Sequence, residues 1–237
     1  MPIKLYSYGD SHAAGHELGS ASDLGKAWLK EHYGVEHRDH LDPTVYHKIV
    51  RPAWIKYIKD NKCNPTLSYA GQLAKMIDAE LVDRAIPGSS NDWSAMRLLE
   101  DLSCITADDI VLFSICTPAR FFSGKGEDET RTQIHWQPIK VQKILYEYGP
   151  HDNSFNIWNQ GLIHLISNIT RDPIIIKTTD DSIEVKGQDT TYNLLFTETS
   201  FTQFAFNKAG HDDIRYPAGH IHEDYHKLYA EYLCQRM

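Results

Sequence analysis

Two uninterrupted apolar segments constrain the fold of this chain more than any other feature of its sequence. They are Asp109–Cys116, which reads Asp-Ile-Val-Leu-Phe-Ser-Ile-Cys, and Pro173–Lys177, which reads Pro-Ile-Ile-Ile-Lys. A strand with one face in water alternates polar and apolar residues, whereas the strands of a parallel sheet are covered on both faces and read as continuous apolar runs. These two segments therefore predict central strands of a parallel sheet that carries helices on both faces.

The rest of the chain alternates strand-like and helix-like segments around these two strands. Further strands are predicted at Ile3–Tyr8 and Glu80–Ile86, and a hairpin or two short strands at residues 182–197. Helices are predicted at Leu24–Tyr33, at Tyr69–Ala79 after a Ser68 cap, from the Ser89…Asp92 capping pair to about Leu102, and at Lys140–Tyr148, Ser154–Ile169 and Glu223–Cys234. This order predicts an α/β fold, namely a three-layer α/β/α sandwich with a mainly parallel central sheet of flavodoxin-like type. We expect a single domain over residues 1–237, with rim insertions at 35–66 and 121–151.

Composition excludes several classes of function. The net charge of −8 argues against non-specific binding to nucleic acid or to an anionic membrane, because both need a basic surface. The sequence shows no signal peptide and no apolar run long enough to insert into a membrane. Its four cysteines lack a C-x-x-C spacing and are read as reduced thiols. We therefore expect a cytoplasmic protein that needs no cofactor, with release by lysis or as part of a particle left open, as is its oligomeric state.

Three segments fall at the carboxyl ends of predicted strands, where ligands bind in such sheets. The first holds Ser11 directly after the first strand, at a turn where backbone N–H groups favour a developing oxyanion. The second holds Gly88, which can bring a bare N–H close to a substrate, and Asn91, which offers an amide donor. The third holds His220, just before the last helix. Ser11 and His220 are thus candidates for the nucleophile and the base of acyl transfer.

Together these blocks resemble the SGNH, or GDSL, hydrolase superfamily. Gly9-Asp10-Ser11 with Gly15 is similar to its first block, Gly88 to its glycine block, and His220 followed by His226 and Ala230 keeps the frame of its C-terminal block. The resemblance implies a serine nucleophile at Ser11, a base at His220, and an oxyanion hole made by Ser11, Gly88 and Asn91. The family's usual third block is replaced here by Ser114-Ile115-Cys116-Thr117.

The acid that would orient His220 is not fixed by the motif. The family often places an aspartate three residues before the histidine, and this chain has Pro217 there. Asp212 and Asp213 lie close upstream, and we take Asp213 as the candidate acid, with Asp212 or a Ser–His dyad as alternatives. A carboxylate mainly fixes the tautomer of the histidine and stabilises the imidazolium, so its loss lowers activity without abolishing it.

A rival motif overlaps the same region. His222-Glu223-Asp224-Tyr225-His226 matches H-E-x-x-H, in which two helical histidines bind zinc and the glutamate acts as base. Catalytic zinc needs three protein ligands, and no downstream third ligand follows His226 at the usual spacing. Such a site would need an upstream ligand such as His211 or His220. The main prediction therefore contains no metal.

The predicted function is ester hydrolysis through a Ser11 acyl-enzyme, acting on a small-molecule or carbohydrate ester, for which O-acetyl groups on carbohydrate are one option. An alternative from another class is an inactive binding or structural module with the same fold, for example a particle or tail component. A zinc-dependent hydrolase that uses His222, Glu223 and His226 is the third hypothesis.

Overall fold

A computed structural model of the chain describes residues 2–18, 20–36, 40–57, 64–116, 120–121, 132–133, 161–166, 168–169, 173–178, 195–197, 199–210, 214–215 and 220–237. Several predictions lie outside these residues: the helix at Lys140–Tyr148, most of the 121–151 insertion, and the 182–194 part of the expected hairpin. Asp212, Asp213 and Pro217 also lie outside them, so the candidate acid is not described. The single-domain organisation stays a prediction.

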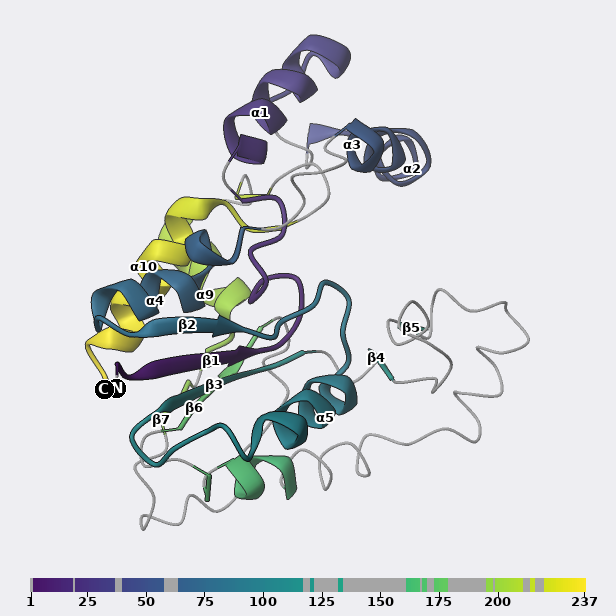
Figure 1. Ribbon diagram of the computed structural model, residues 1–237. Helices are drawn as coiled ribbons and strands as arrows, with labels where there is room; N and C mark the ends of the chain where they lie inside the picture. The colour runs from purple at the N-terminus through teal and green to yellow at the C-terminus, as the bar shows by residue number, and fades with distance from the viewer. Residues whose placement is uncertain are drawn as a thin grey trace.

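The centre of the protein is a five-stranded parallel sheet with the order β2-β1-β3-β6-β7 (Figure 1). Its strands are β1 (Lys4–Tyr8), β2 (Glu80–Asp83), β3 (Ile110–Ile115), β6 (Ile174–Lys177) and β7 (Leu195–Phe196). Each neighbouring pair is parallel. Numbered along the chain, these five strands follow the flavodoxin-like 2-1-3-4-5 order. The predicted fold class is confirmed.

Burial along the strands explains their sequence patterns. All six residues of β3 are buried, and so are all four of β6. In the register between them, Leu112 faces Ile174 and Ser114 faces Ile176. The edge strand β2 is only partly buried, which agrees with its less apolar sequence Glu-Leu-Val-Asp. The continuous apolar runs therefore mark the strands with neighbours on both sides and helices on both faces.

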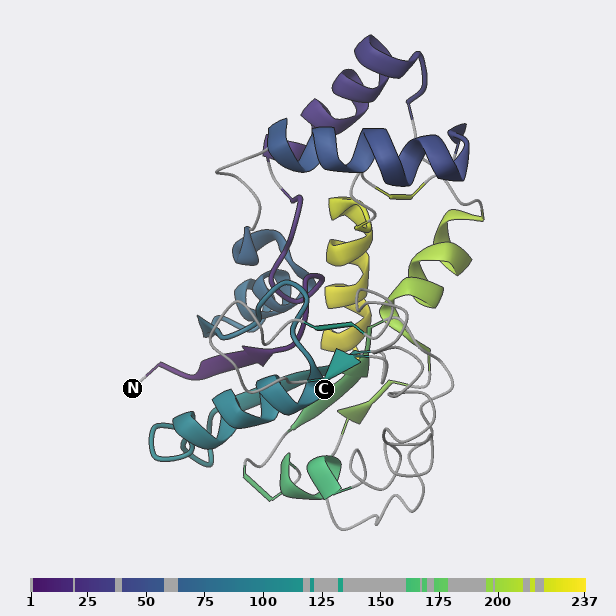
Figure 2. The ribbon, with the colours of Figure 1, turned by 90° about the vertical axis from the view of Figure 1, so that its right-hand side faces the viewer.

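Helices cover both faces of the sheet. One face packs against α4 (Tyr69–Met76), α9 (Phe201–Ala209) and α10 (Glu223–Cys234), and the opposite face packs against α5 (Asn91–Asp101) and the helical residues 161–166 (Figures 1 and 2). Alternate residues of β1 enter the two cores: Leu5 joins the first, and Tyr6 and Tyr8 join the second. This is the three-layer arrangement that the sequence predicts.

Helix boundaries agree with the predictions in some places and correct them in others. Ser68 caps α4, since its Oγ accepts a hydrogen bond from the Gly71 N–H. The cap of α5 is Ser90 rather than Ser89, because the Ser90 Oγ accepts from the Trp93 N–H. The predicted Ser89…Asp92 capping pair is therefore wrong. The Ser89 Oγ instead donates a hydrogen bond to the Gly9 carbonyl at 2.7 Å.

Two elements end earlier than predicted. Helix α4 ends at Met76 instead of Ala79, since Asp78 has a positive φ of 55°, which a helix does not accommodate. Strand β2 ends at Asp83 instead of Ile86. Beyond that point the chain still follows the first strand, because the Ile86 N–H donates to the Gly9 carbonyl at 3.0 Å. The segment after β2 is thereby held against the turn after β1.

The predicted rim insertion at 35–66 is largely helical where it is described. Its elements are α2 (Pro43–Val45), a π-helical turn (Tyr46–Val50), α3 (Arg51–Tyr57) and a 3₁₀ turn (Pro65–Leu67). With α1 (Ser20–Tyr33), the helices α2 and α3 form a group that stands beyond the sheet in Figures 1 and 2. A separate apolar cluster holds this group together, made by Trp28, Leu29, Tyr46, Val50 and Trp54. We call this group the helical cap. A short antiparallel pair, β4 (Arg120–Phe121) with β5 (Thr132–Gln133), lies at the other rim.

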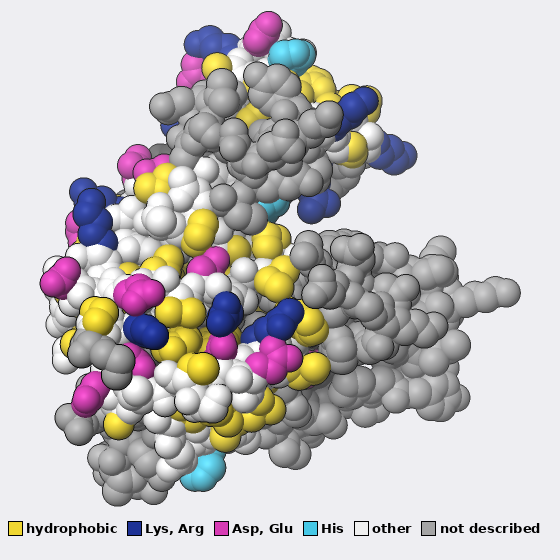
Figure 3. Space-filling model, viewed as in Figure 1, with side chains coloured by type: hydrophobic (Ala, Val, Ile, Leu, Met, Phe, Trp, Pro, Cys, Tyr) yellow, Lys and Arg dark blue, Asp and Glu magenta, His cyan; other side chains and the backbone are white. Residues whose placement is uncertain are grey.

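The described surface carries mixed charge. In Figure 3, acidic and basic side chains are interspersed with apolar ones on the face that is visible. Among the described residues, no helix has both the length and the apolar character needed to cross a bilayer. The three described cysteines, Cys104, Cys116 and Cys234, form no disulfide with one another.

Candidate active site

The turn that follows β1 is built around two glycines. At Gly9 a Cβ would lie 2.6 Å from the Cβ of Ser114 on β3, and at Gly15, with φ of 65°, it would lie 2.2 Å from the carbonyl oxygen of Asn64. Neither contact leaves room for a side chain. These close approaches give a physical reason for both glycines of the first block, and they hold residues 9–15 tightly against the sheet and the chain at Asn64.

Ser11 lies in this turn and is 6% exposed. Its carbonyl accepts a hydrogen bond from the His16 N–H at 2.9 Å, and the Asp10 carboxylate accepts from the His12 N–H at 3.1 Å. Within the described residues, the N–H groups of Ser11 and Gly88 donate to no acceptor. In this described part of the chain, these two N–H groups at the carboxyl edge of the sheet are therefore able to bind another acceptor.

The second block reaches the same edge. Ile86 and Ser89, on either side of Gly88, both donate to the Gly9 carbonyl, so Gly88 is held beside the turn that contains Ser11. Asn91 forms a reciprocal pair with the backbone of Cys116, in which its Nδ2 donates to the carbonyl at 3.1 Å and its Oδ1 accepts from the N–H at 2.8 Å. The amide joins the start of α5 to the end of β3, and one Nδ2 hydrogen remains for another acceptor.

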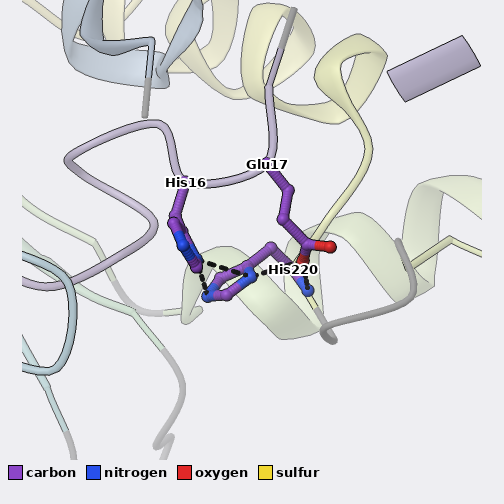
Figure 4. Close-up of side chains that lie close together, drawn as sticks. All are labelled: His16, Glu17 and His220. Carbon is purple, nitrogen blue, oxygen red and sulfur yellow. Dashed lines mark hydrogen bonds and ion pairs between the residues drawn. The ribbon is translucent and has the colours of Figure 1, made fainter. Parts of the chain in front are cut away.

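His220 comes to the site from just before α10 and meets Glu17 (Figure 4). The Glu17 Oε2 lies 2.6 Å from the His220 Nδ1 and also accepts from the His220 backbone N–H at 3.2 Å. A carboxylate bonded to Nδ1 fixes the tautomer that leaves Nε2 able to accept a proton, and it stabilises the imidazolium. Glu17 therefore makes the contact to Nδ1 that an orienting acid would make.

Glu17 is an unusual residue in two respects. Its backbone has a positive φ of 67°, a conformation that costs a non-glycine residue about 1–2 kcal/mol. Its side chain is completely buried, although carboxylates are rarely buried unless paired. The Trp54 Nε1 of α3 donates to the Glu17 Oε1 at 2.5 Å. The carboxylate is thus held from one side by the helical cap and from the other by His220.

Other histidines surround His220. The His16 Nδ1 lies 3.2 Å from both ring nitrogens of His220, with the two rings at 89° (Figure 4). The His12 ring packs edge-on against His220, with a centroid distance of 5.4 Å. Three residues of the turn after β1, His12, His16 and Glu17, therefore contact His220 from near the opposite end of the chain.

The structure brings the three predicted blocks to one edge of the sheet. No hydrogen bond joins Ser11 to His220 within the described residues, because His16 and Glu17 lie nearest to the imidazole. The assignment of Ser11 and His220 as nucleophile and base stays a prediction, as do the roles of Gly88 and Asn91. Sequence reasoning missed Glu17, which no family motif marks. The available signal was its place in the same short turn as Ser11.

The H-E-x-x-H string does not form the helical pair that its motif requires. His222 is the N-cap of α10, with extended backbone, so only His226 lies on the helix. His226 is buried, stacks on Tyr69 at 10° and accepts the Tyr69 N–H at its Nδ1. Burial, together with the nearby His12 and His220, holds its pKa well below the usual value, so the ring is neutral. His226 acts here as part of the core between α4 and α10.

The residues that lie near enough to share a metal ion are different ones. In the described part of the chain, the one such group is His16, Glu17 and His220, whose candidate ligand atoms all lie within 4.8 Å of one another. Two imidazoles and a carboxylate form a donor set that suits zinc and similar ions.

Comparison with known proteins finds similar solved structures at low sequence identity. No family model and no curated protein matches the chain. Its structure is similar to that of a lipolytic protein of the G-D-S-L family from Desulfitobacterium hafniense, at 12% identity and a TM-score of 0.47, over 99% of both chains. It is also similar to an acetylxylan esterase from Geobacillus stearothermophilus, at 15% identity and a TM-score of 0.44, over 99% of this chain and 93% of that one. An α/β hydrolase from the metagenome of Lake Arreo, Spain, gives 13% identity and a TM-score of 0.46, over 99% of this chain and 94% of that one. Likenesses at this level do not assign an activity by themselves.

Proposed function

We propose that this protein is a serine esterase of SGNH type with Ser11 as nucleophile, His220 as general base and Glu17 as the orienting acid. The observation that carries the proposal is the 2.6 Å contact between the Glu17 Oε2 and the His220 Nδ1 beside the Ser11 turn. A buried carboxylate in a strained conformation that holds one histidine is the arrangement that a base needs. Asp213 is not required in this scheme.

The reaction proceeds in two steps, acylation and deacylation. The Ser11 Oγ attacks the ester carbonyl while the His220 Nε2 takes the hydroxyl proton, and the proton then passes to the leaving alkoxide as the ester C–O bond breaks. Water next attacks the acyl-enzyme, gives a proton to His220 and releases the acid, and Ser11 regains its proton. Glu17 stabilises the imidazolium in both steps without taking the proton. Because His16 lies 3.2 Å from the His220 Nε2, this mechanism needs a small rotation of side chains when substrate binds.

The oxyanion is assigned to the N–H groups of Ser11 and Gly88, whose donors have no acceptor within the described residues. The remaining Nδ2 hydrogen of Asn91 is the third candidate donor. One such donor typically contributes about 10²–10³ in rate. Since Ser11 is only 6% exposed, a small acyl group fits this site best. Acetyl esters, and O-acetyl groups on carbohydrate in particular, are the substrates to test first.

The direct test is hydrolysis of p-nitrophenyl acetate by the wild-type chain, by Ser11→Ala and by Ser89→Ala. Ser89 is a matched control, being another buried serine at the same edge. We expect Ser11→Ala to lose activity to background and Ser89→Ala to retain a measurable rate. A fluorophosphonate should label Ser11 alone. Equal rates in wild type and Ser11→Ala, with no labelling of Ser11, would exclude the esterase.

A second candidate is a binding or structural module that has kept the fold without the activity. The reciprocal Asn91–Cys116 pair favours it, because an amide with both ends engaged serves the scaffold. This alternative predicts no labelling and no hydrolysis of any acetyl ester. Labelling of Ser11 by the fluorophosphonate would exclude it.

A further inference from the structure

We propose that His16, Glu17 and His220 form a binding site for a divalent transition metal such as zinc, and that metal bound there inhibits the esterase. The inhibition rests on the proposed function, whereas the binding itself does not. This site is distinct from the H-E-x-x-H string, of which it uses no residue.

The separations of the ligand atoms carry the proposal. In a tetrahedral zinc site with bonds of about 2.0–2.1 Å, neighbouring ligand atoms lie roughly 3.2–3.4 Å apart. The His16 Nδ1 and the His220 Nδ1 are already 3.2 Å apart, and the Glu17 Oε2 lies 2.6 Å from the same His220 nitrogen. The nitrogen pair needs little movement. The carboxylate would move away from His220 by about 0.6–0.8 Å to admit a metal in place of the shared proton.

The surroundings suit such an ion. His16 and His220 are half-buried and Glu17 is fully buried, so the site opens to solvent on its histidine side. The Trp54 Nε1 bonds the Glu17 Oε1 and leaves Oε2 directed at His220. Such outer contacts orient a ligand and commonly raise metal affinity. Three protein ligands with a fourth position open to water give the coordination of an accessible zinc site.

Metal binding changes the tautomer of His220. The ion takes the Nδ1 lone pair, the Nδ1 proton passes to solvent, Nε2 takes a proton from solvent, and no atom is oxidised or reduced. The direct contact between His220 and Glu17 is thereby broken. Because Nε2 then carries the ring proton while Nδ1 is a metal ligand, His220 no longer serves as a base. Metal binding and ester hydrolysis are therefore mutually exclusive.

The test uses the full chain freed of metal with a chelator. Zinc affinity is measured by calorimetry and coordination by the visible absorption of bound Co²⁺, in wild type and in His16→Ala. Two matched controls are His164→Ala, which removes an exposed histidine elsewhere, and Glu223→Gln, which alters the H-E-x-x-H string. Hydrolysis of p-nitrophenyl acetate with and without zinc is compared within each variant as a ratio.

We expect one zinc per chain, and loss of the His16 ligand should weaken binding by about 100-fold or more. Both controls should keep the wild-type affinity. Zinc should inhibit wild type, and the concentration for half-inhibition should rise in His16→Ala by the same factor as the dissociation constant. Unchanged affinity in His16→Ala, or weakened affinity in Glu223→Gln, would overturn the site, and activation by zinc would overturn its inhibitory role. If the chain hydrolyses no ester, the calorimetry and the Co²⁺ spectrum still decide the binding.

Discussion

Two buried carboxylates in this protein have similar partners and different consequences. Glu17 accepts from an aromatic N–H, that of Trp54, and bonds a basic side chain, His220. Asp101 likewise accepts from an aromatic hydroxyl, that of Tyr8 at 2.9 Å, and from a basic side chain, Arg84. The Arg84 pair is two-pronged, with Nε–Oδ2 at 2.9 Å and Nη2–Oδ1 at 3.1 Å.

The difference lies in the basic partner. A guanidinium keeps its charge at every accessible pH, so Asp101 has a partner that does not titrate. An imidazole gains and loses a proton near neutrality, so the partner of Glu17 can take part in proton transfer. The backbone of Glu17 is also strained, with φ of 67°. Asp101 therefore stabilises the fold, whereas Glu17 is held in a strained conformation, which is consistent with the role proposed for it.

The most direct test of this difference between Glu17 and Asp101 is to neutralise each carboxylate in turn. We expect Glu17→Gln to lower kcat by about 10³–10⁴, because the amide favours the wrong tautomer of His220, as in the Ser-His-Asp template. KM should change little. Steady-state kinetics with p-nitrophenyl acetate measure the effect, and circular dichroism checks that the variant is folded. A Glu17→Gln variant with wild-type kcat would remove Glu17 from the mechanism.

Asp101→Asn should show the reverse pattern, with kcat within a few-fold of wild type and a free energy of unfolding about 2 kcal/mol lower. Burial alone would raise the pKa of Asp101, but hydrogen bonds from Arg84 and Tyr8 outweigh it and lower the pKa. Its stabilisation is therefore present at neutral pH and is lost as the pH falls below the ordinary carboxyl value and through the lowered pKa of Asp101. Urea unfolding at pH 7 and near pH 3 should show the difference from wild type shrinking in acid. A constant difference would contradict the ionic assignment.

The aromatic donors offer a finer comparison. Trp54→Phe removes the hydrogen bond to Glu17, and we expect kcat to fall by roughly tenfold, since a hydrogen bond to a charged group contributes about 1.5–3 kcal/mol. The matched control for Trp54→Phe is Trp28→Phe. Trp28 belongs to the same apolar cluster, while the indole N–H that bonds Glu17 is that of Trp54. Tyr8→Phe, at the other carboxylate, should lower stability by about 1 kcal/mol and leave kcat unchanged. Equal kcat in the two tryptophan variants would mean that the contact serves packing alone.

The smallest predicted effect concerns Asp83, for which the described part of the structure gives no bond to a basic side chain like those of Glu17 and Asp101. Asp83 lies in a surface depression with Arg84, Arg97 and Glu100, and burial raises its pKa to about 6. A raised pKa means that the charged form costs stability, so the wild-type protein loses stability as the pH rises from about 4 to 6. Asp83→Asn should therefore stabilise the protein by up to about 1 kcal/mol at pH 7 and by nothing near pH 4. Thermal unfolding at both pH values measures this, and no gain at pH 7 would show that Asp83 is well solvated.

Prediction from the sequence succeeded where the signal was local. The apolar runs identified β3 and β6, the Ser68 cap identified the start of α4, and α10 begins and ends at Glu223 and Cys234 as predicted. The motif order placed Ser11, Gly88 and His220 at one edge of the sheet. The choice of Ser89 as a cap was wrong because its hydroxyl bonds the Gly9 carbonyl, which lies far away in the sequence.

The contacts of Glu17 could not be predicted from its neighbours in the sequence. A short segment gives no sign that a glutamate will be buried, since burial depends on Trp54 and His220, both distant along the chain. The same holds for His226, whose place in a zinc-like string conceals a core position against Tyr69. Residue type and spacing identify candidates, while the partner of each side chain follows from tertiary packing.

The contact between Glu17 and His220 joins residues 203 positions apart in the sequence. Contacts of such separation form late in folding, because the entropy of closing a long loop is lost before the contact contributes any stability. We therefore expect Glu17 and His220 to meet only after the strands between them have assembled. During refolding from denaturant, the proposed esterase activity should return with the slowest phase and never ahead of it. Its recovery would then report on completed folding more strictly than the signal of any single helix.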